Sequence, residues 1–530
     1  MTQFDFLSGR RPPSYARRAM IATSHTLATS AGLAVLAEGG NAVDAALAAV
    51  AVQCVVDPHM TGIGGDCFVL YAPKDGLVRA LNGSGRAPAA ATPEALAQVC
   101  VTGLEQTSAH AITIPGAISA WCLLHRDHGS LPLSRLFAPA IRHAEEGFPV
   151  SARVARDFVA NAEVLRGDAH AAGLFLPGGQ PPRAGDVLRQ PLLGERLREI
   201  AEKGAAGFYH GETAERMTRH LQGLGGLHTL EDFHEGETAA RWEDPISARY
   251  RGHEVLECGP NGQGLAALMI LRILEGFDMG PDVPLADRIH LQAEATKLAY
   301  HHRDALIADP DHSVGLVDLL LSDEVIDTLR TRIDPARALP PALWSEPEHK
   351  DTIYLCVVDA EGNAISFINS IFHAFGSTRL DPETGVLFHS RGASFRLEPG
   401  HPNCIGPRKR PMHTIIPGML RDADGGLMPF GVMGGHYQAA GQAAYLSAII
   451  DRGLDLQAAM EEPRSFAFDG VLQVEATMPP EICDELARRG HRISVIDGPT
   501  GGAQAIRINP ETGVLTGASD SRKDGAALGL

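Results

Sequence analysis

The sequence predicts an α+β protein in which helices cover a β-sheet, and three segments carry this prediction. In GGNAVDAALAAVAVQCVVDP, Asn41 is placed to cap a helix of small side chains that ends before Pro58. In HMTGIGGDCFVLYA, a glycine-rich turn leads into an apolar strand. Residues 353–370 read as two apolar strands joined by a Glu-Gly-Asn turn, which predicts a hairpin near the middle of a sheet. Small side chains on the helix allow it to pack closely on that sheet.

The remaining elements are predicted in chain order from changes in hydrophobic pattern. A turn at Pro115-Gly116 opens a helix, and mostly helical segments follow to about residue 222. Residues 225–260 predict short alternating strands, and residues 262–278 predict a strongly apolar helix. Another helix is expected over residues 290–309. These helices are expected to cover the faces of the sheet.

Size and charge limit the classes of function. A chain of 530 residues exceeds one simple core, so several domains or one large layered assembly are expected. The 64 acidic residues outnumber the 46 basic ones and give a formal charge of −18, which disfavours nucleic acid and anionic membranes as partners. The glycine-rich turn lacks the G-K-[ST] ending of a phosphate loop. Small molecules or peptides are the expected partners.

No metal or cofactor is expected. The eight cysteines are widely spaced without a C-x-x-C pair, and His301 and His302 are not part of an H-E-x-x-H motif. The first 20 residues lack the apolar core of a signal peptide, and no stretch approaches the roughly 20 apolar residues of a membrane span. A cytoplasmic protein is the expectation.

Thr352 stands at the mouth of the predicted hairpin, directly after Asp351 and a proline-rich, charged linker at residues 333–350. A threonine hydroxyl is a weak nucleophile, but its own α-amine can serve as base once the preceding peptide bond is cut. Such a cut would give chains of 351 and 179 residues (530 − 351). The Gly434-Gly435 pair lies between a strand and a helix and could supply amide donors to an oxyanion. Because each feature is common, these residues alone slightly favour a structural threonine.

Several sequence blocks, in the order given below, favour a catalytic Thr352 over a structural one. ATSHTLATSAGLAVLAEGGNAVDAALAAV, DPHMTGIGGDCFVLY, HLQAEATKLAYHHRDALIADP, DTIYLCVVDAEGNAIS, GVMGGHYQ and GASDSRKDGAA occur in this sequence. With them the chain resembles the γ-glutamyltransferase (glutathione hydrolase) family of N-terminal nucleophile (Ntn) hydrolases over nearly its whole length. The resemblance implies a four-layer αββα sandwich and a proenzyme that cuts itself before Thr352. Residues 1–351 and 352–530 would then form one intertwined heterodimer, and whether heterodimers associate further is left open.

The resemblance also implies roles for individual residues. Thr352 would be the nucleophile, and Ser370 stands where the family has a threonine whose hydroxyl supports it. Gly434 and Gly435 match the oxyanion-hole pair. Two further positions, His413 and Thr414, replace a Ser-Ser pair that touches the substrate carboxylate in the family.

This chain departs from the family pattern at several positions that contact the substrate in the family. Where the family has an Arg for the α-carboxylate, this chain has Ser84, with Arg86 two residues later. In the family's Q-x-D-D-F block, this chain has RGASF, so that Arg391 replaces Gln and Ser394 replaces the Asp that holds the α-ammonium. Phe372 replaces an Asn near the substrate, and a shortened lid region predicts an uncovered cleft. Glutathione is thereby disfavoured, and arginines could bind a carboxylate or another planar anion. That Arg391 only fixes the loop remains open.

The resulting hypothesis is an autoprocessing Thr-dependent amide hydrolase. It would act on a γ-glutamyl-like or small anionic acyl amide through an acyl-enzyme, with hydrolysis favoured over transfer. An enzyme resembling oxamate amidohydrolase or a cephalosporin-type acylase is an alternative within the same class. From other classes, a metal hydrolase and an unprocessed binding protein remain, the latter because Asp351-Thr352-Ile353 departs from the family's T-T-H and Tyr354 replaces its His.

Overall fold

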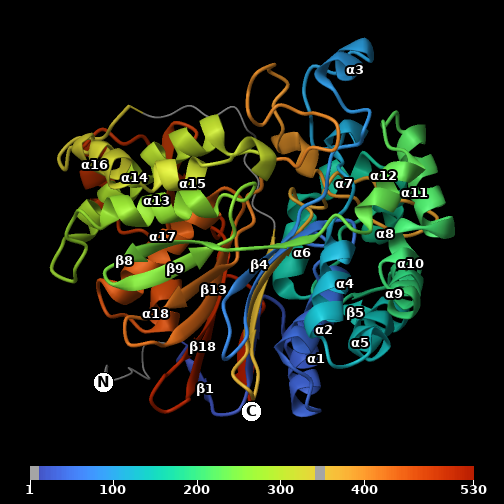
Figure 1. Cartoon of the computed structure of the whole chain (residues 1–530), viewed down its shortest axis with the longest axis horizontal. Helices are drawn as coiled ribbons and strands as arrows, with labels where there is room; N and C mark the ends of the chain where they lie inside the picture. Colours follow the sequence, from blue (N-terminus) through green and yellow to red (C-terminus); the bar gives the residue numbers. More distant parts are fainter. Residues whose placement is uncertain (1–10, 341–351) are drawn as a thin grey trace.

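The computed structural model describes residues 11–340 and 352–530, and it consists of two β-sheets with helices on both outer sides (Figure 1). Each of these two sheets has seven strands. The first sheet has the spatial order β1 (Ser14–Ala16), β18 (Leu515–Ser519), β17 (Gly502–Ile508), β13 (Leu427–Met433), β12 (Gly418–Arg421), β9 (His253–Glu257) and β8 (Ile246–Tyr250). The second has the order β19 (Ala526–Gly529), β2 (Met20–Thr23), β10 (Ile353–Val358), β11 (Ala364–Ser370), β3 (Asp66–Ala72), β4 (Arg79–Gly83) and β7 (Arg241–Glu243).

Smaller sheets accompany them, namely β14 (Ser465–Phe468) with β15 (Val471–Glu475) and β16 (Ile493–Ile496), and β5 (Phe148–Pro149) with β6 (Val187–Leu188). The helices that come first in the chain are α1 (Thr26–Ala37), α2 (Ala42–Val56), α3 (Pro93–Gln98), α4 (Ala117–His128), α5 (Leu133–Glu146), α6 (Ala152–Ala160), α7 (Ala162–Arg166), α8 (Ala169–Phe175), α9 (Pro191–Lys203), α10 (Ala206–Tyr209), α11 (Gly211–Gly223) and α12 (Leu230–Gly236). The later helices are α13 (Gly264–Leu274), α14 (Leu285–Leu306), α15 (Leu316–Leu320), α16 (Asp323–Thr331), α17 (Tyr437–Ile450), α18 (Leu456–Glu461) and α19 (Pro480–Arg488). Short 3₁₀ turns lie at Ala109–Ala111, Pro177–Gly179, Pro310–His312 and Arg391–Ser394.

Three hydrophobic clusters separate four layers. One joins the second sheet to helices that include α1, α2, α4 and α5, and another joins the first sheet to α13, α14 and α17. The third lies between the two sheets. Strand β10 shows how the sequence produces this arrangement, because Ile353, Leu355 and Val357 belong to the helix-facing cluster. The residues between them, Tyr354 and Cys356, belong to the cluster between the sheets. Both faces of the strand are buried, as its unbroken apolar run predicts.

Helix α2 confirms the first segment of the prediction. Asn41 caps it by accepting a hydrogen bond from the Asp44 backbone N–H, while the Asp44 side chain accepts one from the Asn41 N–H. Every residue of the helix is buried, and its small side chains allow it to lie close to the second sheet. The expected close packing of helix on sheet is therefore present.

The hairpin β10–β11 lies in the middle of the second sheet, as predicted. Its antiparallel register pairs Ile353 with Asn369, which places Thr352, one residue earlier, opposite Ser370. The register of β11 with β3 pairs Ser370 with Asp66. Three polar residues thus lie in a row across neighbouring strands at one end of an otherwise apolar sheet.

The structure corrects one part of the secondary-structure prediction. Residues 225–260 were expected to form short strands, but Leu230–Gly236 is helix α12. A capping box explains it, because the Thr229 side chain accepts from the Asp232 N–H and the Asp232 carboxylate accepts from the Thr229 N–H. Strands β7, β8 and β9 then follow as predicted.

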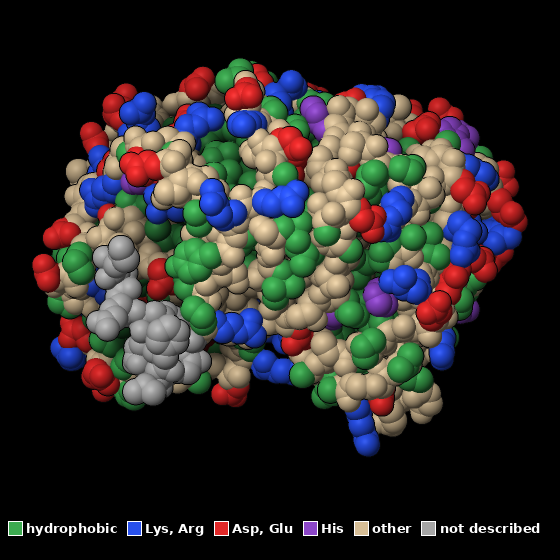
Figure 2. Space-filling view, turned by 90° about the horizontal axis from the view of Figure 1, so that it is seen from below, with side chains coloured by type: hydrophobic (Ala, Val, Ile, Leu, Met, Phe, Trp, Pro, Cys, Tyr) green, Lys and Arg blue, Asp and Glu red, His purple; other side chains and the backbone are tan. Residues whose placement is uncertain are grey.

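The surface carries charges of both signs. On the face shown in Figure 2, Lys and Arg side chains are interspersed with Asp and Glu side chains across both halves of the molecule. Among residues 11–340 and 352–530, none of the helices combines the length and hydrophobicity that a membrane-spanning segment requires.

Candidate active site

Thr352 and Ser370 form the centre of the candidate site. The Thr352 hydroxyl donates a hydrogen bond to Ser370 Oγ over 3.2 Å, and Ser370 Oγ also accepts from the Phe372 backbone N–H at 2.9 Å. Both side chains are almost fully buried. Gln438 Nε2 lies 3.5 Å from Thr352 Oγ1, a weak contact from α17. The sheet register therefore brings the proposed nucleophile and its proposed supporting hydroxyl together, while Asp351 lies outside the described residues.

Asp66 lies beside Ser370 on strand β3 and is completely buried. Its Oδ1 accepts hydrogen bonds from the N–H groups of Gly85 at 2.8 Å and Gly116 at 3.1 Å. Its Oδ2 accepts from His413 Nε2 at 3.0 Å and lies 3.2 Å from His389 Nδ1. This one carboxylate therefore connects strand β3 to four separate parts of the chain around the site.

The protonation states of this group follow from its surroundings. Burial alone would raise the pKa of Asp66, but the charge and hydrogen bond of His389, together with His413, hold that pKa well below its usual range. Burial, reinforced by the positive charge of Arg391, lowers the pKa of His413 to about 3. At neutral pH Asp66 is thus ionised, and His413 is a neutral ring that donates its Nε2–H to the carboxylate.

We expect the substitution Asp66→Asn to lower the free energy of unfolding at pH 7 by about 3 kcal/mol, because it removes a buried charge from several donors. A depressed carboxyl pKa stabilises the folded state above the unfolded-state pKa, and this contribution is lost as pH falls through the folded-state value. The difference in urea unfolding midpoint between parent and variant should therefore stay constant from pH 7 down to about pH 4, near the unfolded-state pKa, and shrink below it. The exposed Asp318→Asn is the matched control. Equal midpoints for parent and Asp66→Asn at pH 7 would contradict the assigned role.

Gly434 and Gly435 form the turn between strand β13 and helix α17. Gly434 has a φ of 121°, which strongly favours glycine, and a Cβ atom there would make a tight contact of 3.0 Å with the Gly501 Cα. The Gly434 carbonyl accepts from the Tyr437 N–H at 3.0 Å, and the Gly435 carbonyl accepts from the Gln438 N–H at 3.2 Å. Because both carbonyls are held by the first turn of α17, the Gly434–Gly435 and Gly435–His436 peptide planes are fixed, and the first of these carries the Gly435 N–H.

Gln263 connects this turn to the segment that contains Thr414. Its Nε2 donates to the Gly435 carbonyl at 3.0 Å and to the Thr414 carbonyl at 2.7 Å. Its Oε1 accepts from Arg303 Nη1 at 2.8 Å, and all these groups are buried. A single amide side chain therefore sets the distance between the predicted oxyanion turn and the predicted substrate-binding residues.

Arg391 provides a buried positive charge near Phe372. Its guanidinium carbon lies 3.9 Å from the centre of the Phe372 ring, and its Nη1 donates to Thr414 Oγ1 at 3.1 Å. Only 1% of Arg391 is exposed. Burial and the charge of Arg391 lower the pKa of His373 to about 4, so the neighbouring histidine adds no second charge at neutral pH. The chemistry that this geometry favours is binding of a small planar anion.

Phe372 adopts an unfavourable backbone conformation, with a φ of 80°. The hydrogen bond from its N–H to Ser370 Oγ and the stacked guanidinium hold it there. Its side chain belongs to a buried apolar cluster with Phe395 and Ile405. Strained residues of this kind concentrate at functional sites, and this one joins the hairpin to the Arg391 pocket.

Two residues that were predicted to bind substrate, Ser394 and Arg86, bond backbone carbonyls in the structure. Ser394 Oγ lies 2.7 Å from the Met412 carbonyl and 3.0 Å from the Arg391 carbonyl, and its single O–H donates to this pair, so the hydroxyl fixes the loop. Arg86 is partly exposed and donates to the Arg408 carbonyl at 2.8 Å. It lines a cavity of about 510 Å³ beside residues 400–409, the shortened lid region. The uncovered cleft expected from that lid is not seen at Thr352, which is buried in the uncut chain.

A known protein family matches this sequence over most of its length. The family profile described as Gamma-glutamyltranspeptidase matches residues 28–530. The chain belongs to the γ-glutamyltranspeptidase family.

Individual relatives place the chain within the γ-glutamyltranspeptidase family. It is 37% identical over 524 residues to the oxamate amidohydrolase proenzyme of Klebsiella pneumoniae subsp. pneumoniae, covering 96% of this chain and 98% of that one. It is 36% identical over 528 residues to the glutathione hydrolase-like YwrD proenzyme of Bacillus subtilis, with 96% and 98% covered. The crystal structure of a cephalosporin acylase from Bacillus halodurans is 39% identical, with a TM-score of 0.91 over 100% of this chain and 99% of that one.

These likenesses confirm the family and the enzyme class expected from the motifs. The chain is a glutathione hydrolase-like amidohydrolase of the γ-glutamyltranspeptidase family, near oxamate amidohydrolase, with an Ntn-hydrolase fold. The roles of the individual site residues stay predictions.

Sequence reasoning missed Asp66, Gln263 and His389 as parts of this γ-glutamyltranspeptidase site. A signal for Asp66 was present, because an acidic residue at the start of the buried strand DCFVLYA needs partners. Nothing local distinguishes Gln263 or His389 from surface residues. Their importance comes from contacts with residues more than 100 positions away in the sequence.

Proposed function

We propose that this protein is an autoprocessing amide hydrolase with Thr352 as its nucleophile. The Thr352 hydroxyl would attack the Asp351 carbonyl, and hydrolysis of the resulting ester would release residues 1–351 and 352–530 as large and small fragments of one heterodimer. The observation that carries the proposal is the 3.2 Å hydrogen bond between Thr352 Oγ1 and Ser370 Oγ at the end of a central hairpin. Both curated relatives named above are proenzymes, which supports a processing step.

The new α-amine of Thr352 would then serve as the base, with an unperturbed pKa of about 8. It takes the hydroxyl proton as Oγ1 attacks the substrate amide carbon, and it returns that proton to the leaving amine. The N–H groups of Gly434 and Gly435 would stabilise the oxyanion, and Ser370 would orient the hydroxyl. Water then attacks the ester, which frees the acid and restores Thr352.

The substrate is proposed to be a small acyl amide that carries a carboxylate. Arg391 supports this, because a buried guanidinium stacked on Phe372 and hydrogen-bonded to Thr414 suits a planar anion. With Ser394 in place of an acidic residue, the site offers no carboxylate at that position for a substrate ammonium. His413, which is neutral at pH 7, would line the same pocket. Hydrolysis is proposed to exceed transfer to an amino acceptor.

A cephalosporin-type acylase is the second candidate, and the TM-score of 0.91 with the Bacillus halodurans cephalosporin acylase favours it. Initial hydrolysis rates on oxamate, a γ-glutamyl anilide and a cephalosporin acyl amide separate the candidates. We expect oxamate to give the highest kcat/KM. A preference for the γ-glutamyl compound by about tenfold or more would contradict the proposed role of the altered pocket.

A further inference from the structure

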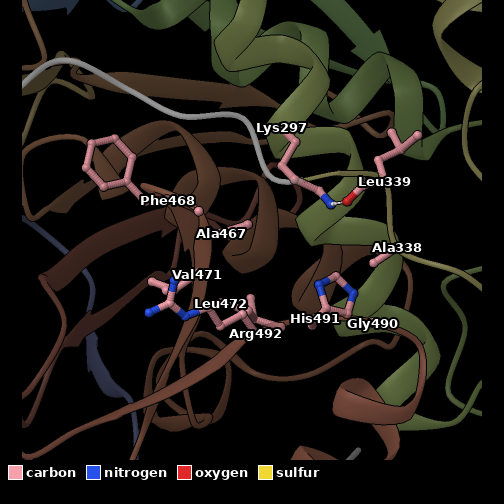
Figure 3. A pocket seen from close by; sticks show the side chains of 11 residues that line it. Lys297, Ala338, Leu339, Ala467, Phe468, Val471, Leu472, Gly490, His491 and Arg492 are labelled. Atoms are coloured by element: carbon pink, nitrogen blue, oxygen red, sulfur yellow. Dashed lines mark hydrogen bonds between the residues drawn. The ribbon is translucent and has the colours of Figure 1, made fainter.

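A second buried polar cluster takes no part in the proposed chemistry. His290, Glu294 and Lys297 come from successive turns of α14, and His491 comes from the turn between α19 and β16. His290 and Glu294 are completely buried. Figure 3 shows Lys297 and His491 beside residues of the segment that follows α16, at a small cavity. Buried polar groups require partners, and most of those found here are backbone groups of that segment.

The backbone partner of the histidine pair shows which nitrogen of His290 donates a hydrogen bond. The Asp334 carbonyl lies 2.8 Å from His290 Nε2 and can only accept, so His290 donates from Nε2. His290 Nδ1 and His491 Nε2 lie 2.8 Å apart, so the two rings share a hydrogen bond. Burial and the charge of Lys297 lower the pKa of His491 to about 3, in keeping with a neutral ring. The two histidines thus form a chain of hydrogen bonds that ends on the Asp334 carbonyl.

The charged pair holds the next part of the same segment. Glu294 Oε2 accepts from the Leu339 N–H at 2.8 Å, and Lys297 Nζ donates to the Leu339 carbonyl at 2.9 Å. The Ala338 N–H donates to the Arg489 carbonyl at 2.8 Å. Both backbone polar groups of Leu339 are therefore bound by side chains of opposite charge, as in recognition of an extended peptide.

We propose that this cluster of four side chains is a docking site for residues 334–339. We call the cluster the tail anchor. With the cut after Asp351, a step that rests on the proposed function, the docked segment belongs to the large fragment. Helix α14 belongs to the large fragment as well, whereas Arg489 and His491 belong to the small one. The Ala338–Arg489 and His290–His491 hydrogen bonds therefore join the two fragments. The tail anchor keeps the end of the large fragment attached after processing.

The same side chains satisfy a distance criterion for a metal site. Ligand atoms of His290, Glu294 and His491 lie within 4.8 Å of one another. However, the Lys297 ammonium already lies 2.5 Å from Glu294 Oε1, and His290 Nδ1 is hydrogen-bonded to His491 Nε2. The carboxylate thus has a cation beside it and the two rings bond each other, which favours peptide docking over metal binding.

The test uses trypsin, because Arg337 is exposed and precedes the docked residues Ala338 and Leu339. Glu294→Gln combined with Lys297→Met replaces the buried ion pair by neutral side chains of similar size, a change that buried pairs often tolerate. Glu199→Gln combined with Lys203→Met is the matched control at a half-exposed helical pair that does not contact the segment. Intact mass identifies cleavage between Arg337 and Ala338.

We expect the double variant of the anchor to be cut at this bond about tenfold faster than the parent, because local opening becomes easier. The control pair should leave the rate unchanged. Equal rates in parent and anchor variant, or equal acceleration in the control, would overturn the proposal. It would also be overturned if chelator treatment of the parent alone produced the acceleration, since a metal would then hold the segment.

Each variant is also tested in a Thr352→Ala chain. Protection of the Arg337–Ala338 bond should be the same there, because the contacts do not depend on the cut. If the unsubstituted protein does not cut itself, the proposed function is contradicted. The trypsin assay in the Thr352→Ala chain still tests the tail anchor in that case. Loss of protection in the Thr352→Ala chain alone would contradict the anchor as proposed.

Discussion

Thr352→Ala is expected to leave the chain as a single species of 56.3 kDa, whereas the parent is expected to separate into fragments of 351 and 179 residues (530 − 351). Alanine lacks the hydroxyl that would attack the Asp351 carbonyl, so neither self-cleavage nor acyl-enzyme formation can occur. Amide hydrolysis should fall by at least about 10³-fold, because removal of a nucleophile disables the whole catalytic unit. Denaturing mass spectrometry after purification and initial-rate assays measure the two effects.

Thr352→Ser is the matched control, since it keeps the hydroxyl and loses only a methyl group. It should still process, and the small fragment should then begin with the introduced serine. Cleavage at the same bond in Thr352→Ala would contradict the assigned nucleophile. A parent chain that stays intact, indistinguishable from Thr352→Ala, would instead support the unprocessed binding protein.

Arg391→Met is expected to lower kcat/KM for a carboxylate-bearing amide by about 10² to 10³, the usual cost of removing one partner of a buried charge pair. Methionine retains much of the side-chain volume over the Phe372 ring, where the guanidinium carbon lies 3.9 Å from the ring centre. Self-cleavage should proceed, because the hydroxyl pair Thr352 and Ser370 is unchanged. Rates on the best carboxylate substrate and on its neutral methyl ester separate loss of charge recognition from general damage.

Arg86→Met is the comparison for this experiment. Arg86 is partly exposed and hydrogen-bonded to a backbone carbonyl, so its loss should cost no more than about tenfold in kcat/KM, as expected for a screened charge. An unchanged kcat/KM in Arg391→Met would show that Arg391 only fixes its loop. Equal losses on the acid and the ester would lead to the same conclusion.

Much of the fold was predictable because local signals agreed with the global structure. The Asn41 cap, the apolar run of β10 and the short turn to β11 each indicate one element, and each forms as indicated. The exception is α12, whose Thr229–Asp232 capping box outweighed the strand-like pattern around it. The arrangement of two sheets face to face depends on contacts far apart in the sequence, and family resemblance supplied it.

The candidate site was predictable only in part. The row Thr352–Ser370 follows from hairpin register, and the position of Gly434 follows from its strand-turn-helix context. The partners of Asp66 lie on segments whose spatial proximity no local pattern reveals. For the same reason Arg86 and Arg391 looked equivalent in the sequence, although one is partly exposed and the other buried.

The strand order of both sheets determines how the protein unfolds and refolds after the proposed cut. In the second sheet, β10 lies between β2 and β11, and β11 pairs in turn with β3, so β10 and β11, which follow residue 351, are inserted between strands that precede it. The first sheet likewise combines β1, β8 and β9 with strands that follow residue 351. Before the proposed cut, refolding is unimolecular. Afterwards two chains must meet, so recovery from denaturant should depend on protein concentration, and dilution should favour the unfolded pair.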